Sequence, residues 1–364
     1  MPERDNCLTI VIATRDHPLR IRPQLQLYKQ ANFACPLIIA DSGEAPEAAH
    51  VRDLAQGPVT YRSFEPRLSL CAKLASVVAT VDTPLVLLSP DRKIMFPHAI
   101  DAAVAHLMRH QDYVAAMGYG IGFTLRDQTV DIDRVVVFTP TIADDDPLQR
   151  HYHLMQRYQP WLWGLFRRDA LANALAAASA VRGYLFQEIM LGNAMVLQGK
   201  FARLPLIFRM EGAEQSLTTL KESDPLFWFA DDPRSFFRHY IHYRNHLARF
   251  IAAQAIAVPA GTDARQLIDT LHAVWLNRNF DDGVLNHATR RLLGDAIAPL
   301  PTVRARPAWQ PVGKGDVASP PKSPCYIWRH GVLNAEPRGE INISRDEQKQ
   351  AERQLDTYLM YQVE

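Results

Sequence analysis

The chain has 364 residues, of which 48% are hydrophobic, and its 40 basic and 39 acidic side chains give a net charge of +1. This length and composition predict a globular protein with a large core, and the balanced charge argues against nucleic acid as a partner. The sequence shows no basic-then-apolar leader, and no run approaches the roughly 18 apolar residues of a membrane span. We therefore expect a cytoplasmic protein without a transmembrane segment.

The first hundred residues repeat one pattern, in which an apolar run is followed by a turn and an amphipathic stretch. The apolar runs predict strands over residues 8–13, 36–40, 59–62 and 85–88. The stretches that follow them predict helices over residues 19–31, 44–56, 68–81 and 97–110. Strands that alternate with helices in such short units predict a mainly parallel sheet that is covered by helices on both faces.

The end of the fourth predicted strand carries the most informative residues of the chain. Asp91, Arg92 and Lys93 follow this apolar run directly. Open α/β sheets bind ligands at the carboxyl ends of their strands. These three charged residues are therefore candidate site residues.

Two tryptophans follow further strands that we expect over residues 113–117 and 134–139. Trp161 and Trp163 bracket a leucine just before an alanine-rich helix over residues 170–180. Their rings either bind the faces of sugars or bases or fill the core beneath the sheet, and the sequence leaves both alternatives open.

Glu188 is the one acid in the first turns of a helix that we expect to begin at Gly183, before a strand over residues 199–209. Apolar surroundings raise the proton affinity of a carboxylate, which suits a general base. A glutamate near a helix start is also an ordinary partner of the helix dipole, so this alternative stays open.

The rest of the chain predicts a helical extension and a terminal segment. Helices are expected over residues 233–254, 265–276 and 287–297, and the mixture of arginines and aromatic residues in the first suits packing on the main domain or a peripheral membrane contact. Ser344 and Glu347 form a capping-box pattern that opens a helix to about residue 361, which docks on the main body or on another subunit. The predicted organisation is a main domain over residues 1–214, a helical extension over 215–298, a proline-rich linker or arm over 299–324 and a C-terminal segment over 325–364.

Taken in order, several weak motifs resemble those of bacterial family-2-like glycosyltransferases of the GT-A fold. They are Thr9–Arg15, Ile38–Ser42, Thr83–Asp91, Trp163–Arg167, Glu188 and Gly199-Lys200. The resemblance spans roughly residues 8–212 and depends on order and spacing, because no motif is diagnostic alone. It implies a GT-A-like, Rossmann-like α/β fold and a hexosyltransferase-type enzyme of polysaccharide biosynthesis, which moves a sugar from a nucleotide-sugar donor to a glycan or surface-polysaccharide acceptor.

The resemblance also implies roles for individual residues. The carboxylate at Glu188 would deprotonate the acceptor hydroxyl, and the acid at Asp91 would hold Mg²⁺ or Mn²⁺ on the diphosphate. Trp161 or Trp163 would bind the acceptor. The residues implied to bind the nucleotide are Ala13, Thr14, Arg15, Asp41, Ser42 and Lys73.

The chain departs from this family at the metal motif, where relatives carry a run of acids and this sequence has Asp91-Arg92-Lys93. In one alternative, Arg92 or Lys93 replaces the metal and stabilises the diphosphate directly. In a second, Asp91 holds a metal weakly through the diphosphate. In a third, the domain is catalytically inactive and only binds a nucleotide, a glycan or another protein. A nucleotidyltransferase is a further alternative, against which the lack of a glycine-rich basic loop after the first strand argues.

Overall fold

The computed structural model describes residues 2–15, 18–43, 56–126, 129–137, 139–156, 158–212, 225–281, 325–328 and 343–360. The helix expected over 287–297, the linker 299–324 and nearly all of the helix expected over 44–56 lie outside the described residues. Within them, no helix is long and apolar enough to cross a membrane. All four cysteines are free thiols, and Cys325 is exposed whereas the other three are buried.

The first half of the sheet is parallel, as the sequence predicts. Its strands pair in the spatial order β4-β1-β2-β3: β1 (Leu8–Thr14), β2 (Leu37–Asp41), β3 (Val59–Ser63) and β4 (Leu85–Pro90). Strands β1, β2 and β4 are buried along their whole length, because helices cover both of their faces. The helical elements of this half are α1 (Pro2–Cys7), η1 (Pro18–Ile21), α2 (Arg22–Gln30), α3 (Leu70–Val78) and α4 (Pro97–Arg109).

The second half of the sheet contains both parallel and antiparallel pairs, within an α/β sheet whose pairs are mostly parallel, as the sequence predicts. It contains β5 (Lys93–Met95), β6 (Tyr113–Arg126), β7 (Thr129–Val137), β8 (Leu165–Arg167), β9 (Lys200–Gly212) and β10 (Cys325–Trp328). Strand β8 lies antiparallel between β4 and β6, and β9 pairs parallel with β6 and antiparallel with β5. Strand β6 ends well after the expected range 113–117, and β7 begins before the expected range 134–139. A Cβ atom at Gly118 would lie 2.2 Å from the Leu206 carbonyl oxygen, so glycine permits the close approach of β6 and β9.

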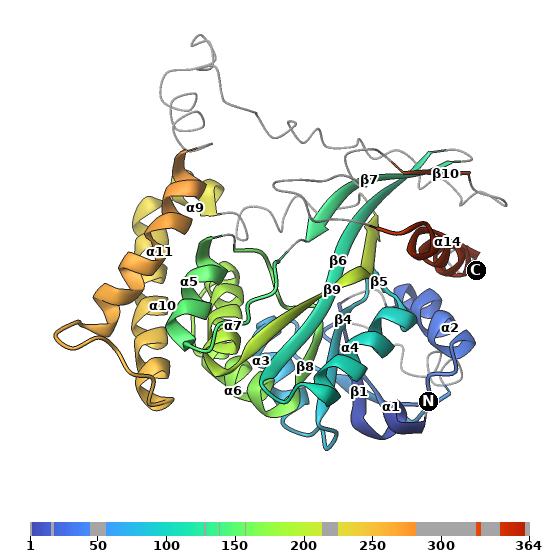
Figure 1. Cartoon of the computed structure of the whole chain (residues 1–364), viewed down its shortest axis with the longest axis horizontal. Helices are drawn as coiled ribbons and strands as arrows, with labels where there is room; N and C mark the ends of the chain where they lie inside the picture. Colours follow the sequence, from blue (N-terminus) through green and yellow to red (C-terminus); the bar gives the residue numbers. More distant parts are fainter. Residues whose placement is uncertain are drawn as a thin grey trace, which may run out of the picture.

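Helices complete both sides of the sheet. The remaining ones are α5 (Pro147–Gln156), α6 (Arg168–Ser179), α7 (Tyr184–Gln198), α9 (Pro225–Asp231), α10 (Pro233–Ala253), α11 (Ala264–Asp281) and α14 (Arg345–Met360). Helices α2, α4 and α14 lie on one side of the sheet, whereas α5, α7, α10 and α11 lie on the other (Figure 1). The helical extension thus packs on the main domain through α7 and α5.

The terminal helix α14 docks on the main body, which settles one of the alternatives that the sequence left open. The backbone N–H of Glu347 donates to Ser344 Oγ at 3.1 Å, as the capping-box pattern predicts. The Glu347 carboxylate does not complete the box. It accepts instead from the backbone N–H of Ile207 in β9 at 2.7 Å.

Candidate functional site

The carboxyl ends of β1, β2 and β4 bring several predicted residues together. Thr14 lies opposite Asp41 in the β1–β2 ladder, and its hydroxyl donates to the Asp91 carboxylate at 2.9 Å. The backbone N–H of Asp91 donates to the Ala13 carbonyl at 3.2 Å, and that of Ser42 donates to the Thr14 carbonyl at 3.2 Å. Five of the candidate residues therefore share one edge of the sheet, as the topology of open α/β sheets predicts.

Asp41 is held rigidly at this edge. It is 1% exposed, one carboxylate oxygen accepts from the Gly43 backbone N–H at 2.7 Å, and the other accepts from the Tyr61 hydroxyl. Tyr61 is not among the residues that the sequence predicts for the site. In the β2–β3 ladder Asp41 pairs with Ser63, so Tyr61, two residues earlier, lies on the same face. A polar aromatic residue at this offset is the signal that would have found it.

Lys73 connects the ends of β1 and β2 from the first turn of α3. Its buried ammonium donates to the Thr14 carbonyl at 3.1 Å and to the Ala40 carbonyl at 3.2 Å. Burial lowers the pKa of Lys73 to about 8, against the opposing charges of Asp41 and Asp91. In this structure the side chain therefore positions the strand ends, and its ammonium is not presented to solvent.

The two basic residues after Asp91 have different surroundings. Arg92 is exposed, whereas Lys93 begins β5 opposite Glu211 of β9, and its ammonium lies 2.6 Å from the Glu211 carboxylate. Burial, and then the charge of Arg209, lower the pKa of Lys93 to about 8. Burial also raises the pKa of Asp91, against its hydrogen bond from Thr14 and the charge of Arg92. Arg92 is thus the more accessible of the two expected diphosphate ligands.

A divalent cation does not fit the residues around Asp91. In the part of the chain that the structure describes, no group of three or more His, Cys, Asp or Glu side chains is arranged to hold a metal ion. Asp91 is followed by two bases, and its oxygen Oδ2 already accepts from Thr14. Mg²⁺ and Mn²⁺ prefer several oxygen ligands, so this donor set is a poor one.

Glu188 lies in the second turn of α7, within a group of polar side chains. The hydroxyls of Tyr184 and Tyr158 donate to its carboxylate over long distances, 3.4 and 3.5 Å. Burial raises the pKa of Glu188 to about 7, against the charge of Lys93, the two tyrosines and Arg209. A carboxylate with such a pKa changes protonation near neutral pH, which is what a general base requires, and the role of Glu188 stays a prediction.

We call Glu188 and the side chains around it the base cluster. The surrounding side chains are Tyr158, Tyr184, Lys93, Arg209 and Glu211. Of these side chains, only Lys93 is among the site residues predicted from the sequence. Arg209 and Glu211 alternate on an otherwise apolar stretch of β9, so they share one face of that strand, and this alternation is the available signal. Arg209 is buried, and its Nε–H has no hydrogen-bond partner among the described residues.

The base cluster adjoins the strand-end residues. The side chain of Gln187, the neighbour of Glu188, donates to the hydroxyl of Ser69 at 3.3 Å, and Ser69 is the N-cap of α3, the helix that carries Lys73. Lys93 is two residues from Asp91. Asp41, Asp91 and Glu188 therefore belong to one region of the molecule.

The two tryptophans have different surroundings. Trp161 is 1% exposed, its ring centroid lies 3.8 Å from that of Phe201, and its indole N–H donates to Thr139 Oγ1 at 3.1 Å. Trp161 therefore fills the core, which is the second of the two alternatives and corrects its expected role in acceptor binding. Trp163 is half-buried, and its carbonyl accepts from Arg209 at 3.0 Å, so it adjoins the base cluster.

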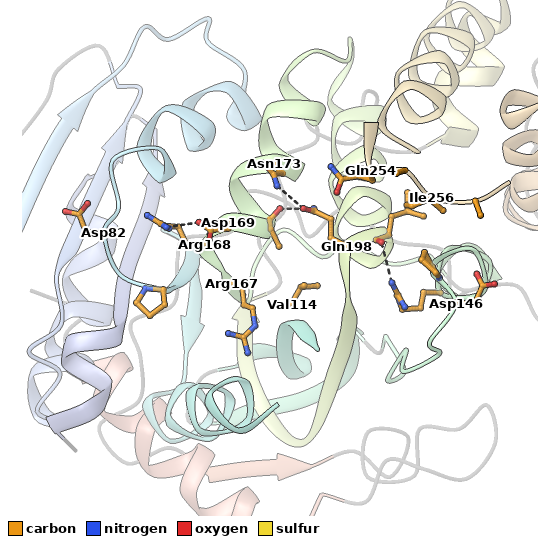
Figure 2. A pocket seen from close by; sticks show the side chains of 17 residues that line it. Asp82, Val114, Asp146, Arg167, Arg168, Asp169, Asn173, Gln198, Gln254 and Ile256 are labelled. Carbon is orange, nitrogen blue, oxygen red and sulfur yellow. Dashed lines mark hydrogen bonds and ion pairs between the residues drawn. The ribbon is translucent and has the colours of Figure 1, made fainter. Parts of the chain in front are cut away.

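A surface pocket of about 840 Å³ lies at the opposite edge of the sheet, around the amino end of β4 (Figure 2). It contains Arg150, Arg167 and Arg168. Arg150 donates to the carbonyls of Val196 and Leu197 at the end of α7, and Arg167 to carbonyls at the end of α4. Arg168 pairs with Asp169 at 2.7 Å. These guanidinium groups mainly satisfy helix C-termini, so this pocket gives no catalytic arrangement.

Comparison with solved structures identifies proteins of similar fold. S. aureus TarS 1-349 in complex with UDP-GlcNAc matches with a TM-score of 0.50 at 10% sequence identity, over 78% of this chain and 75% of that chain. The complex of TarS 1-349 with UDP has a TM-score of 0.47 at 11% identity, over 79% and 75%. A longer TarS structure has a TM-score of 0.47 at 11% identity, over 77% of this chain and 44% of that chain.

No protein-family profile matches the sequence, and no curated protein matches it. At about 10% identity the structural similarity concerns the fold alone. It agrees with the mixed sheet between helical layers, and the fold is the GT-A-like α/β fold that the sequence predicts.

Proposed function

We propose that this protein is a glycosyltransferase, which moves a sugar from a nucleotide-sugar donor to a glycan acceptor. The observation that carries the proposal is Glu188, a part-buried carboxylate with a pKa raised to about 7, beside the strand-end residues of a GT-A-like fold. The TarS structure with UDP-GlcNAc supports a nucleoside-diphosphate sugar as the class of donor. The resemblance in sequence supports a surface polysaccharide as the class of acceptor.

The donor would bind across the carboxyl ends of β1, β2 and β4. Asp41 and Ser42 supply rigid polar groups for the nucleoside, and Thr14 and Arg15 form the turn beside it. Lys73 holds the two strand ends in register through the Thr14 and Ala40 carbonyls. Such a preformed edge reduces the ordering that binding requires.

Transfer requires a base for the acceptor and positive charge for the leaving group. The acceptor oxygen forms a bond to the anomeric carbon while the bond from that carbon to the diphosphate oxygen breaks, and the diphosphate takes the electron pair. The proton of the acceptor hydroxyl moves to a Glu188 oxygen. Before transfer, the two positive charges of Lys93 and Arg209 balance the two negative charges of the glutamates. The base cluster therefore gains one net positive charge when Glu188 is protonated.

The diphosphate would be stabilised without a metal ion. Arg92 is exposed at the turn that follows β4, and a guanidinium group binds two phosphate oxygens at once. The poor fit of a divalent cation at Asp91 supports this part of the proposal. Trp163, beside Arg209, is the remaining aromatic candidate for the acceptor sugar.

A second candidate is a GT-A-like protein that binds a nucleotide without transferring a sugar. The observation in its favour is the ion pair of Lys93 with Glu211, which leaves Arg92 as the exposed base directly after Asp91. Transfer separates the two candidates, since only the enzyme turns over a donor.

Titration calorimetry with UDP and GDP, each with Mn²⁺ and with chelator, is the first test. We expect binding that persists with chelator. Binding that requires Mn²⁺ would contradict the metal-independent proposal, and no binding under either condition would contradict both candidates.

A further inference from the structure

Helix α10 carries positive charge and no negative charge. Its 21 residues include no aspartate or glutamate, and they include four arginines, Arg234, Arg238, Arg244 and Arg249. Arg244 pairs with Asp269 of α11. The other three arginines are exposed, and within the described parts of the chain none of them has a carboxylate partner. The adjacent acids, Asp231 and Asp232, precede the helix, so its outer surface is basic along its length.

Two large apolar side chains lie on this basic surface. Phe237 and Ile241 are 44% and 46% exposed, and because they are four residues apart they are neighbours on one face of the helix. Arg234 and Arg238 flank them at the same spacing, and Arg249 lies about three turns beyond Arg238 on the same side. We call these five side chains the α10 face. Exposed apolar side chains that are rimmed by polar groups mark interaction sites.

The opposite side of α10 holds this face in a fixed position. Its buried side chains include Phe236, Tyr240, Tyr243 and Leu247. The ring of Tyr243 stacks on that of Phe186 in α7, with 5.6 Å between the centroids. Helix α10 lies with α9 and α11 at the edge of the molecule that is farthest from α14 (Figure 1). The α10 face is therefore an outer surface of the folded body, and its apolar side chains do not contribute to the core.

We propose that the α10 face attaches this protein to the surface of a membrane that contains anionic phospholipids. Its three guanidinium groups would contact lipid phosphate groups, and no acid on the helix opposes this attraction. The side chains of Phe237 and Ile241 would enter the boundary between headgroups and acyl chains. A soluble polyanion would attract the same arginines but would leave the two apolar side chains in water, so the face fits a bilayer better.

Cosedimentation with vesicles tests the role of the charges. We expect the full chain to bind vesicles of phosphatidylcholine with about one third phosphatidylglycerol, and to bind pure phosphatidylcholine vesicles far more weakly. Arg238→Glu and Arg249→Glu should each weaken binding about tenfold, since one basic side chain near an anionic surface contributes about fivefold and its reversal adds repulsion. No binding by the wild-type protein, or equal binding to both kinds of vesicle, would overturn the inference.

Arg109→Glu is the matched control for charge. Arg109, on α4, and Arg249 are both exposed, and the Nε–H of each donates to the carbonyl four residues earlier in its own helix, at 3.0 and 3.3 Å. Reversal at Arg109 should leave vesicle binding unchanged. An equal loss at both positions would show a general effect of net charge and would overturn the inference.

Ile241→Ser tests the role of the apolar side chains, and Met108→Ser on α4 is its control. Both side chains are 46% exposed, so neither change should alter the Tm. We expect Ile241→Ser to weaken vesicle binding about five- to tenfold and Met108→Ser to leave it unchanged. A loss in the arginine variants without a loss in Ile241→Ser would show that the face binds a soluble polyanion, and would overturn the inference. Vesicle binding requires no sugar transfer, so its failure and the failure of the proposed function are separate results.

Discussion

The strand-end residues and the base cluster lie side by side but are built in different ways. Thr14, Asp41 and Asp91 each stand at or directly after the end of a buried strand, and Lys73 binds two backbone carbonyls there. The base cluster joins side chains from β5, β9, α7 and the segment between α5 and β8. Local sequence therefore determines the first group, whereas the pairing of distant strands determines the second.

Burial shifts pKa values in both groups, since it lowers that of Lys73 and raises that of Asp91 at the strand ends, so the two groups differ mainly in how firmly their carboxylates are held. The polar atoms of Asp41 have protein partners, so this edge is ready to bind without rearrangement. In the base cluster, burial raises the pKa of Glu188 and lowers that of Lys93, each to near neutrality. Both shifts disfavour the charged forms, and such shifts concentrate at functional sites. We infer that chemistry belongs to the base cluster and recognition to the strand ends.

Glu188→Gln is expected to have the largest effect, and it tests directly whether the base cluster carries the chemistry. If the base cluster carries the chemistry, turnover of the nucleotide-sugar should fall about 10²- to 10⁴-fold, because the variant cannot accept a proton, while UDP binds as before. Initial rates and calorimetry measure the two quantities. Asp169→Asn, an exposed acid on α6, is the control and should leave both unchanged. Wild-type turnover in Glu188→Gln would make this residue structural.

The pH dependence of stability tests the same carboxylate without a substrate. Because its pKa rises from 4.5 to about 7 on folding, the folded state holds a proton that the unfolded state has released between these pH values. The contribution of Glu188 to stability should therefore be most favourable below pH 4.5 and should be lost as the pH rises to 7, whatever the other groups contribute. Denaturant titrations should show Glu188→Gln gaining at most about 3 kcal/mol over wild type across this range. A constant difference between the two proteins would contradict the raised pKa.

Asp91→Asn and Asp82→Asn compare the two ends of β4. Asp82 precedes this strand at the pocket of Figure 2, whereas Asp91 follows it at the strand-end residues. Asp91→Asn keeps the shape of the side chain but changes its charge and its bond from Thr14, so we expect UDP affinity to change about tenfold. Asp82→Asn should leave the affinity unchanged. An equal effect of both variants would remove the distinction between the two edges.

Sequence alone predicts the strand-end residues because apolar runs locate buried strands and the residue after each run is then at a known edge. Strands β1 to β4 are confirmed in this way. Strands β5 and β8 were missed, since three residues are too few to show alternation. Because β5 was not predicted, its pairing with β9 was not predicted either. This pairing turns Lys93 toward Glu211 instead of toward solvent. Tyr158 lies between elements, where no periodicity marks it.

Arg92→Ala sharpens the comparison at the segment Asp91-Arg92-Lys93. Arg92 is exposed, so it would attract the diphosphate through a hydrated, screened contact, and its loss should weaken UDP binding only several-fold at low salt and less at high salt. Uridine, which lacks phosphate, should bind both proteins equally. Arg109→Ala, an exposed arginine at the far end of α4, is the control. Calorimetry at two salt concentrations measures these effects. A loss that salt does not change would indicate a buried, specific contact, and Arg92 would then belong with the rigid strand-end residues.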